Sequence, residues 1–229
     1  MKFQNCILFL GMLLLVACSK DDDINPDSNK IKFDNLAVGQ KSNYVFLSGQ
    51  NYFDINGFDD FQYLQDTLVL EIIGQNQDQF MVKESISPGS AVLNGTENKW
   101  IAEPDEDYLY FIEVVGNQFK VTPISGTLVQ SRIFIGNIEL DLEKFTAEEV
   151  EIKGWKTSLN ECGCEKKVFT QDYKLFDQQY DHLNIYLNNT ALAVDGEGFT
   201  YVYNQSDGIV RQSIYSPWTG SGAGWDLVP

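Results

Sequence analysis

Apolar and polar residues alternate over short stretches along much of this chain, a pattern that is typical of β-strands with one buried face. Two pairs of these stretches are separated by turn-forming residues, so each pair predicts a β-hairpin. The first joins Thr67–Ile73 to Gln79–Glu84 through a five-residue loop. The second joins Tyr108–Val115 to Gln118–Thr122 through Gly116-Asn117, a two-residue turn suited to positive φ.

Further strands are expected in the rest of the chain, with turn residues between them. They lie at Asn43–Leu47, Ser131–Ile135, Glu149–Trp155, Leu183–Leu187, Ala191–Val194, Phe199–Tyr203 and Ile209–Tyr215. Glu139–Ala147 and Leu175–Asp181 predict two short helices. This pattern predicts an all-β fold, either an antiparallel β-sandwich or a meander barrel with lipocalin-like closure. We expect one domain over residues 30–229, with two packed halves and a seam near 125–131 as the alternative.

The first residues have the pattern of a secretory signal. Lys2 is followed by the apolar run Cys6–Ala17, which is shorter than the roughly 20 residues that a membrane-spanning helix needs. The run ends in Leu15-Val16-Ala17-Cys18, which resembles the lipobox of bacterial lipoproteins. The resemblance implies that residues 1–17 are a signal peptide, removed when Cys18 becomes the lipidated N-terminus, with palmitate among the expected acyl groups.

A polar stretch, residues 18–29, follows this cysteine and predicts a flexible tether. Its acidic run Asp21–Asp23 resembles the export signal of surface lipoproteins in the Bacteroidota group. The resemblance implies an outer-membrane protein, held by its lipid and facing the cell exterior. An ordinary polar linker on a periplasmic protein is the alternative.

The net charge of the chain limits the classes of molecule that it can bind. It has 33 acidic and 16 basic residues, a formal charge of −17, which argues against nucleic acid as a partner. A hydrophobic fraction of 43% with 13% aromatic residues is enough for a substantial core.

The cysteines and the single histidine offer little chemistry. Cys162 and Cys164, separated by one glycine, suit a short disulfide in an oxidising compartment, and together with His182 they are weak candidates for a metal site. The chain contains no Gly-x-Ser-x-Gly nucleophile turn. No catalytic residue is assigned, and no cofactor is expected.

Aromatic side chains among amides are the candidate ligand contacts. Tyr52 and Phe58 lie in a segment rich in asparagine and aspartate, and Trp218 and Trp225 bracket a glycine-rich stretch. Aromatic faces beside polar groups suit sugars, although core filling explains the same residues. Separately, Asp66-Thr67-Leu68 resembles an O-glycosylation signal of exported Bacteroidota proteins, with Thr67 as acceptor.

These features together predict a lipid-anchored surface protein that acts as a non-catalytic binding or transport-accessory module. Its partners would be the membrane, through the lipid, and a nutrient such as a glycan or an outer-membrane transporter. The first alternative is a hydrolase that uses carboxylates from separate strands. The second is a structural envelope protein that recognises another protein.

Overall fold

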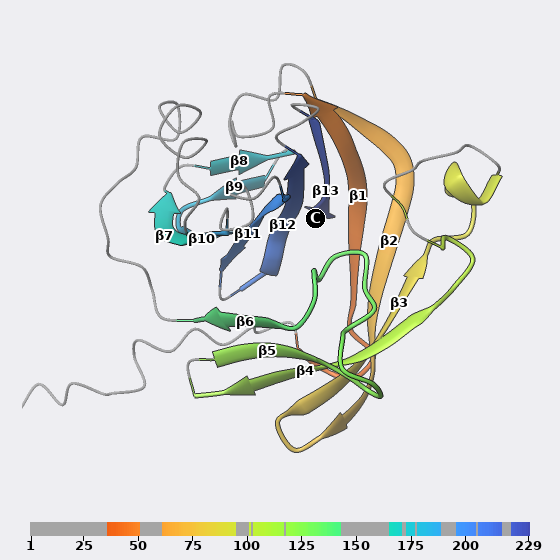
Figure 1. The fold of residues 1–229 in the computed structure, drawn as a ribbon, viewed down its shortest axis with the longest axis vertical. Helices are drawn as coiled ribbons and strands as arrows, with labels where there is room; N and C mark the ends of the chain where they lie inside the picture. Colours follow the sequence, from red (N-terminus) through yellow and green to blue (C-terminus); the bar gives the residue numbers. More distant parts are fainter. Residues whose placement is uncertain are drawn as a thin grey trace, which may run out of the picture.

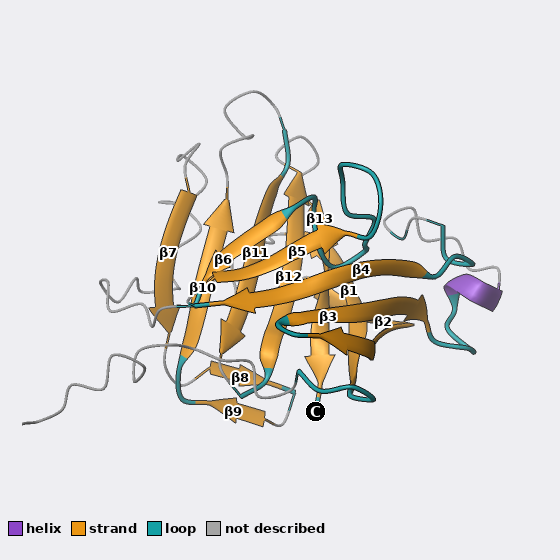
Figure 2. Ribbon diagram, turned by 90° about the horizontal axis from the view of Figure 1, so that it is seen from below, coloured by secondary structure: helices purple, strands orange, loops and turns teal. Residues whose placement is uncertain are grey.

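The structure is a computed structural model of the 229-residue chain, and its described part is built almost wholly from β-strands (Figures 1 and 2). The described residues are 36–50, 61–94, 101, 103–116, 118–142, 165–170, 173–176, 178–188, 196–204, 206–216 and 221–229. Within these ranges the helical structure is one 3-10 turn, η2 (Val92–Asn94), and no helix is long and apolar enough to cross a membrane. The predicted all-β, antiparallel class is confirmed.

Eleven of the described strands form one antiparallel sheet in the order β6-β5-β4-β3-β2-β1-β13-β12-β11-β10-β7. The strands are β1 (Lys41–Gln50), β2 (Phe61–Asn76), β3 (Gln79–Ile86), β4 (Tyr108–Val115), β5 (Gln118–Pro123), β6 (Ile138–Asp141), β7 (Glu165–Thr170), β10 (Leu183–Asn188), β11 (Gly198–Asn204), β12 (Gly208–Ser216) and β13 (Ser221–Val228). Strands next to each other in sequence are mostly neighbours in the sheet, so the topology is a meander. The pairing of β1 with β13 joins its two halves.

The sheet curls so strongly that β4–β6 lie across from β10–β12, as in a barrel that is not fully closed (Figures 1 and 2). Side chains bridge the remaining gap. The Tyr203 hydroxyl on β11 donates a hydrogen bond to the Asp141 carbonyl on β6, over 2.7 Å. The concave face holds the main core, because alternate residues of each strand point inward. Aromatic residues of this core include Tyr44, Tyr110 and Phe119.

Residues 124–137 form the loop between β5 and β6; its first residues, 124–128, are exposed, and its later part packs into this concave interior. Its Phe134 is 1% exposed and meets Tyr110 edge to face, with ring centroids 5.6 Å apart. The Ile135 amide donates to the Tyr201 hydroxyl over 2.9 Å, which ties the loop to β11. Asn137 cross-links the loop internally. Its side-chain Nδ2 donates to the Thr127 carbonyl, and its Oδ1 accepts from the Val129 amide. The later part of the loop is therefore a part of the core that links the two halves of the sheet.

A smaller core lies on the outer face of β10–β12. The hairpin of β8 (Tyr173–Leu175) and β9 (Gln178–Tyr180) covers it, with Leu175 and Tyr180 packed on Ile185, Val202 and Val210. Arg211 and Asp226, a cross-strand pair on β12 and β13, form a buried ion pair on the same outer side.

Most of the predicted strands are confirmed. The hairpin β2–β3 has a tighter turn than expected, because β2 continues to Asn76 and only Gln77-Asp78 separate it from the start of β3 at Gln79. The hairpin β4–β5 and the strands at 43–47, 183–187, 199–203 and 209–215 are as predicted. The strands expected at Glu149–Trp155 and Ala191–Val194 lie outside the described residues.

Three predicted elements are wrong where they are described. Ser131–Ile135 is loop, because its polar groups bond to side chains of the core instead of a strand ladder. Glu139–Ala147 begins as strand β6, which pairs with β5, and not as a helix. Leu175–Asp181 contains parts of the β8–β9 hairpin, where Phe176 at the turn has a φ of 52°. The alternation in these short segments was too brief to distinguish a strand from a helix or a loop.

Candidate functional site

A cavity of about 320 Å³ lies on the concave face between the β5–β6 loop and strands β1, β12 and β13. Its apolar lining includes Val129, Ile135, Ile214 and Ala223. Its aromatic and polar lining consists of Phe46, Tyr108, Gln130, Ser131, Arg132, Glu197, Gln212 and Trp225, with Gly224 beside them. This volume is at the small end of ligand sites, which are about 300–1,000 Å³.

The floor of the cavity is a row of side chains set by the register of adjacent strands. Phe46 is paired with Trp225, and Trp225 with Gln212. The Phe46 and Trp225 rings meet nearly edge to face, with centroids 4.8 Å apart and planes inclined by 65°. The indole Nε1 donates to the Arg132 carbonyl over 3.1 Å, so the floor is tied to the loop above it.

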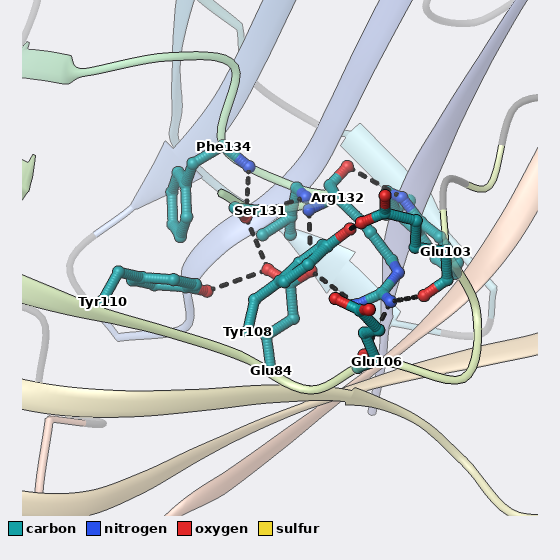
Figure 3. A network of polar contacts seen from close by, with 10 residues as sticks. Glu84, Glu103, Glu106, Tyr108, Tyr110, Ser131, Arg132 and Phe134 are labelled. Carbon is teal, nitrogen blue, oxygen red and sulfur yellow. Dashed lines mark hydrogen bonds and ion pairs between the residues drawn. The ribbon is translucent and has the colours of Figure 1, made fainter. Parts of the chain in front are cut away.

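Glu84 on β3 anchors the loop from below (Figure 3). Its carboxylate is buried and accepts from the Ser131 hydroxyl at 2.5 Å, the Arg132 amide at 2.6 Å and the Tyr110 hydroxyl at 3.1 Å. The Arg132 guanidinium adds a charged contact of 3.4 Å. Four donors from three residues therefore converge on one carboxylate, which fixes residues 131–134 against the sheet.

Arg132 also fixes a second loop. Its Nη2 donates to the carbonyls of Glu103 and Glu106, the latter over 2.7 Å. The guanidinium lies 4.2 Å from the centre of the Tyr108 ring, a cation–π distance. The Tyr108 hydroxyl donates to Glu103 Oε2 over 2.8 Å. Arg132 thus contacts protein groups on several sides, as Figure 3 shows, and stabilises the cavity wall by joining the two loops to β3.

The electrostatics of this network follow from burial. Loss of hydration raises the pKa of the Glu84 carboxyl, and the contacts from Ser131, Arg132 and Tyr110 lower it in part. Burial and the neighbouring Glu84 charge raise the pKa of Tyr110 well above its ordinary value. Burial and the hydrogen bond to Glu103 raise the pKa of Tyr108 to about 12. Both tyrosines therefore remain neutral hydrogen-bond donors at physiological pH.

Gln212 differs from its neighbours in this floor. It lies on β12 between Tyr201 and Trp225 and is 2% exposed. The Tyr201 hydroxyl and the Trp225 indole are both hydrogen-bonded to the β5–β6 loop. Its side chain borders the cavity, and its amide is not among the described polar groups that are closed off without a partner. An amide in this position is available to a bound molecule.

The structure brings one of the predicted ligand contacts to this cavity, namely Trp225. Cys18, the aromatic residues Tyr52, Phe58 and Trp218, and the cysteines Cys162 and Cys164 lie outside the described residues. His182 lies elsewhere, just before β10, with its Nε2 3.2 Å from Asn184 Oδ1. Across the described ranges, no three His, Cys, Asp or Glu side chains gather in a metal-binding arrangement.

Thr67 lies on β2 and is half-buried, with its amide donating to the Ser90 hydroxyl over 3.0 Å. The preceding Asp66 is 2% exposed and accepts from the Val92 amide at the start of η2 over 2.6 Å. Two residues of the glycosylation-like tripeptide therefore already have structural contacts. Glycosylation of Thr67 stays a prediction.

Sequence reasoning missed Gln212, Glu84 and Arg132. Gln212 is part of a strand that was predicted correctly, but it sits among apolar inward positions, and its neighbours on the cavity face, Tyr201 and Trp225, come from other strands. Glu84 has one sequence signal, since it falls on the apolar face of β3 between Val82 and Ile86. A carboxylate on an apolar face predicts a buried partner, although not which one.

No protein-family model matches this chain, and no curated protein matches it in sequence. A solved structure of an outer membrane lipoprotein-sorting protein domain from Vibrio parahaemolyticus aligns with 82% of this chain and 83% of its own. The identity is 8% and the TM-score is 0.23, a similarity too low to establish a shared fold.

Proposed function

We propose that this protein is a non-catalytic binding module of the bacterial outer membrane that captures a small nutrient such as a glycan. The observation that carries the proposal is the cavity between the β5–β6 loop and the sheet, with Phe46 and Trp225 in its floor. It combines apolar surface, aromatic rings and a few convergent polar groups, the composition of small-molecule sites. Its wall is held by Glu84 and Arg132, so the site is preorganised for binding.

The polar groups of the wall support binding over bond chemistry. The Ser131 hydroxyl donates to Glu84 and accepts from the amides of Ile133 and Phe134. A nucleophilic serine needs a general base, and here its proton is directed to a carboxylate that already accepts several other hydrogen bonds. These groups position the loop, and the ligand contacts fall to the floor and the rim.

A cavity-filling variant tests the site. The full chain is screened by ligand-observed NMR against sugars, nucleosides, amino acids and short peptides. Ala223→Leu places a larger side chain in the cavity lining and is expected to abolish binding of every true ligand. Leu109→Ala, at a 47% exposed position of β4, is the control and retains binding. Binding that survives Ala223→Leu, or turnover of any screened compound, contradicts the proposal.

The cellular part of the proposal places the protein on the outer membrane through lipidated Cys18, beside a transporter that takes up the captured nutrient. Its support is the lipobox-like sequence and the acidic run after it. Cys18→Ser is expected to remove palmitate labelling and release the protein from the membrane fraction. Proteinase added to intact cells degrades the wild-type protein if it faces the exterior, and leaves it intact if it faces the periplasm.

A further inference from the structure

The chemistry of the cavity also indicates what kind of ligand it takes, and the starting point is Gln212. Gln212 is 98% buried as a residue on β12, but its amide is not among the described polar groups that are closed off without a partner, because it borders the cavity. A side-chain amide that faces a cavity can exchange hydrogen bonds with water or with a bound molecule. An amide both donates and accepts, so it matches a hydroxyl group, which does the same.

The position of Gln212 favours a flat, partly apolar ligand. The side chain is flanked on the same face by Tyr201 and Trp225, one on each neighbouring strand. Ile214 and Ala223 continue the apolar lining one step along the same strands. A pyranose ring has apolar C–H surfaces and a hydroxyl periphery, so it fits an amide set among aromatic and aliphatic groups.

The charges around the cavity disfavour an anion. Arg132 is the cation in the lining, and Glu84 compensates its charge directly. The carboxylates of Glu103 and Glu106 lie on the loop that Arg132 holds, and Glu197 is an exposed carboxylate in the lining itself. The described lining therefore holds one guanidinium, which Glu84 already neutralises, and one exposed carboxylate, Glu197, which repels a negatively charged ligand.

We propose that Gln212 recognises the ligand of this cavity and that the ligand is an uncharged, hydroxyl-bearing ring compound, namely a neutral mono- or disaccharide. The inference rests on the proposed function, because it requires the cavity to be a binding site. Gln212 exchanges hydrogen bonds with a ring hydroxyl, and the aromatic and aliphatic lining covers the C–H face. Glu197, the exposed carboxylate of the lining, discriminates against the corresponding uronic acids.

The test compares matched sugars on the full chain. Glucose, galactose, mannose, cellobiose and lactose are titrated by calorimetry, beside glucuronate and galacturonate. At least one neutral sugar is expected to bind, and its uronate is expected to bind more weakly. If ligands of another class bind and are lost in Ala223→Leu, while no neutral sugar binds, this inference is overturned and the proposed function stands. If nothing binds the cavity, both fail.

Two variants assign the roles. Gln212→Met keeps the length of the side chain and removes its hydrogen bonds, so about a tenfold loss of sugar affinity is expected, with unchanged thermal unfolding. Ser213→Ala, the next residue on the opposite face of β12, is the matched control and retains affinity. Equal affinity in wild type and Gln212→Met means that water satisfies the amide, which overturns the role of Gln212.

Glu197→Gln removes the exposed carboxylate of the lining while it keeps the shape of the side chain. It is expected to strengthen uronate binding severalfold and to leave the neutral sugar unchanged. The exposed Glu139→Gln on β6, which removes the same charge away from the cavity lining, is the control. If both variants change uronate affinity equally, the discrimination comes from net charge and not from the site, and the role of Glu197 is overturned.

Discussion

Two buried arginine–carboxylate pairs lie on opposite faces of the sheet and hold different kinds of structure together. Arg211 and Asp226 are directly opposed on β12 and β13, 15 residues apart in sequence, and bond through two N–H groups. Glu84 on β3 and Arg132 in the β5–β6 loop are 48 residues apart. The first pair reinforces a ladder that the backbone already makes. The second fixes a loop that has no ladder, and so builds the cavity wall.

The partners of each arginine show why this difference matters. Asp226 also accepts from the Tyr63 hydroxyl over 2.8 Å, and Tyr63 stacks on Phe176 of the β8–β9 hairpin. This outer cluster therefore joins strands to a covering hairpin. Arg132 instead has carbonyl and aromatic partners that would remain after loss of Glu84. Removing one charge from the Arg211–Asp226 pair should therefore lower the stability of the whole fold. Removing one charge from the Glu84–Arg132 pair should loosen mainly the β5–β6 loop.

The largest effect is expected from Arg211→Met. It leaves the Asp226 carboxylate buried without its cation, which costs about 3–5 kcal/mol of the free energy of unfolding. Urea unfolding followed by circular dichroism measures this loss. The double variant Arg211→Met/Asp226→Leu removes both charges and is expected to recover much of it. A double variant no more stable than the single one contradicts this account of the pair.

Glu84→Gln tests the other pair, with an expected cost of about 3 kcal/mol at neutral pH. An amide would turn N–H groups toward the donors of Ser131, Arg132 and Tyr110. Because Arg132 keeps its other contacts, the loss should be concentrated in the β5–β6 loop. Hydrogen exchange is expected to increase there and to remain unchanged in β12 and β13. Uniform acceleration would mean that the two regions do not differ.

The same variant has a defined pH dependence. Burial raises the folded-state pKa of Glu84 above its ordinary value of 4.5. The stability linked to its proton is fully present below about pH 4.5 and is lost as the pH rises through the folded-state pKa. The advantage of wild type over Glu84→Gln should therefore shrink as the pH rises from 4 toward neutrality, measured by urea unfolding at each pH. An advantage that grows with pH contradicts a raised pKa.

Gly224→Ala tests how closely β12 and β13 approach each other beside the Arg211–Asp226 pair. A Cβ at Gly224 would lie 2.3 Å from the Gln212 carbonyl oxygen and 2.9 Å from Ser213 Cβ, so β12 and β13 must move apart. We expect a cost of about 2 kcal/mol and weaker ligand binding, because Gln212 and Trp225 flank this point. Gly74→Ala is the control, since its Cβ meets Met81 Cβ at an ordinary 3.7 Å. Equal costs in thermal unfolding would contradict the close approach at Gly224.

The smallest effect is expected from Lys120→Ala on β5. Its 3.4 Å contact with Glu139 on β6 joins two partly exposed side chains, which lie 38% and 58% open to solvent. Such pairs contribute about 0.5 kcal/mol or less, and salt screens them. Thermal unfolding at low and high salt measures the change. A loss as large as that of Arg211→Met would show that burial is not what distinguishes the ion pairs.

Local alternation was sufficient to predict the longer hairpins. β2–β3 and β4–β5 contain alternating apolar residues on both sides of a turn, so each hairpin can be inferred from one short stretch. β13 was missed because its first residues, Ser221–Gly224, have little intrinsic strand preference. Its strand conformation depends on pairing with both β1 and β12. Tertiary context decided that element.

The sequence by itself determined the all-β class, the main hairpins and the presence of an aromatic such as Trp225 among candidate ligand contacts. Only the tertiary structure decided that the β5–β6 loop enters the core, that Glu84 meets Arg132, and that Gln212 borders a cavity beside Trp225. Strand formation follows from a period of two that a few neighbouring residues display. A cavity wall needs contacts between residues far apart in the chain, which only the curvature and register of the whole sheet bring together.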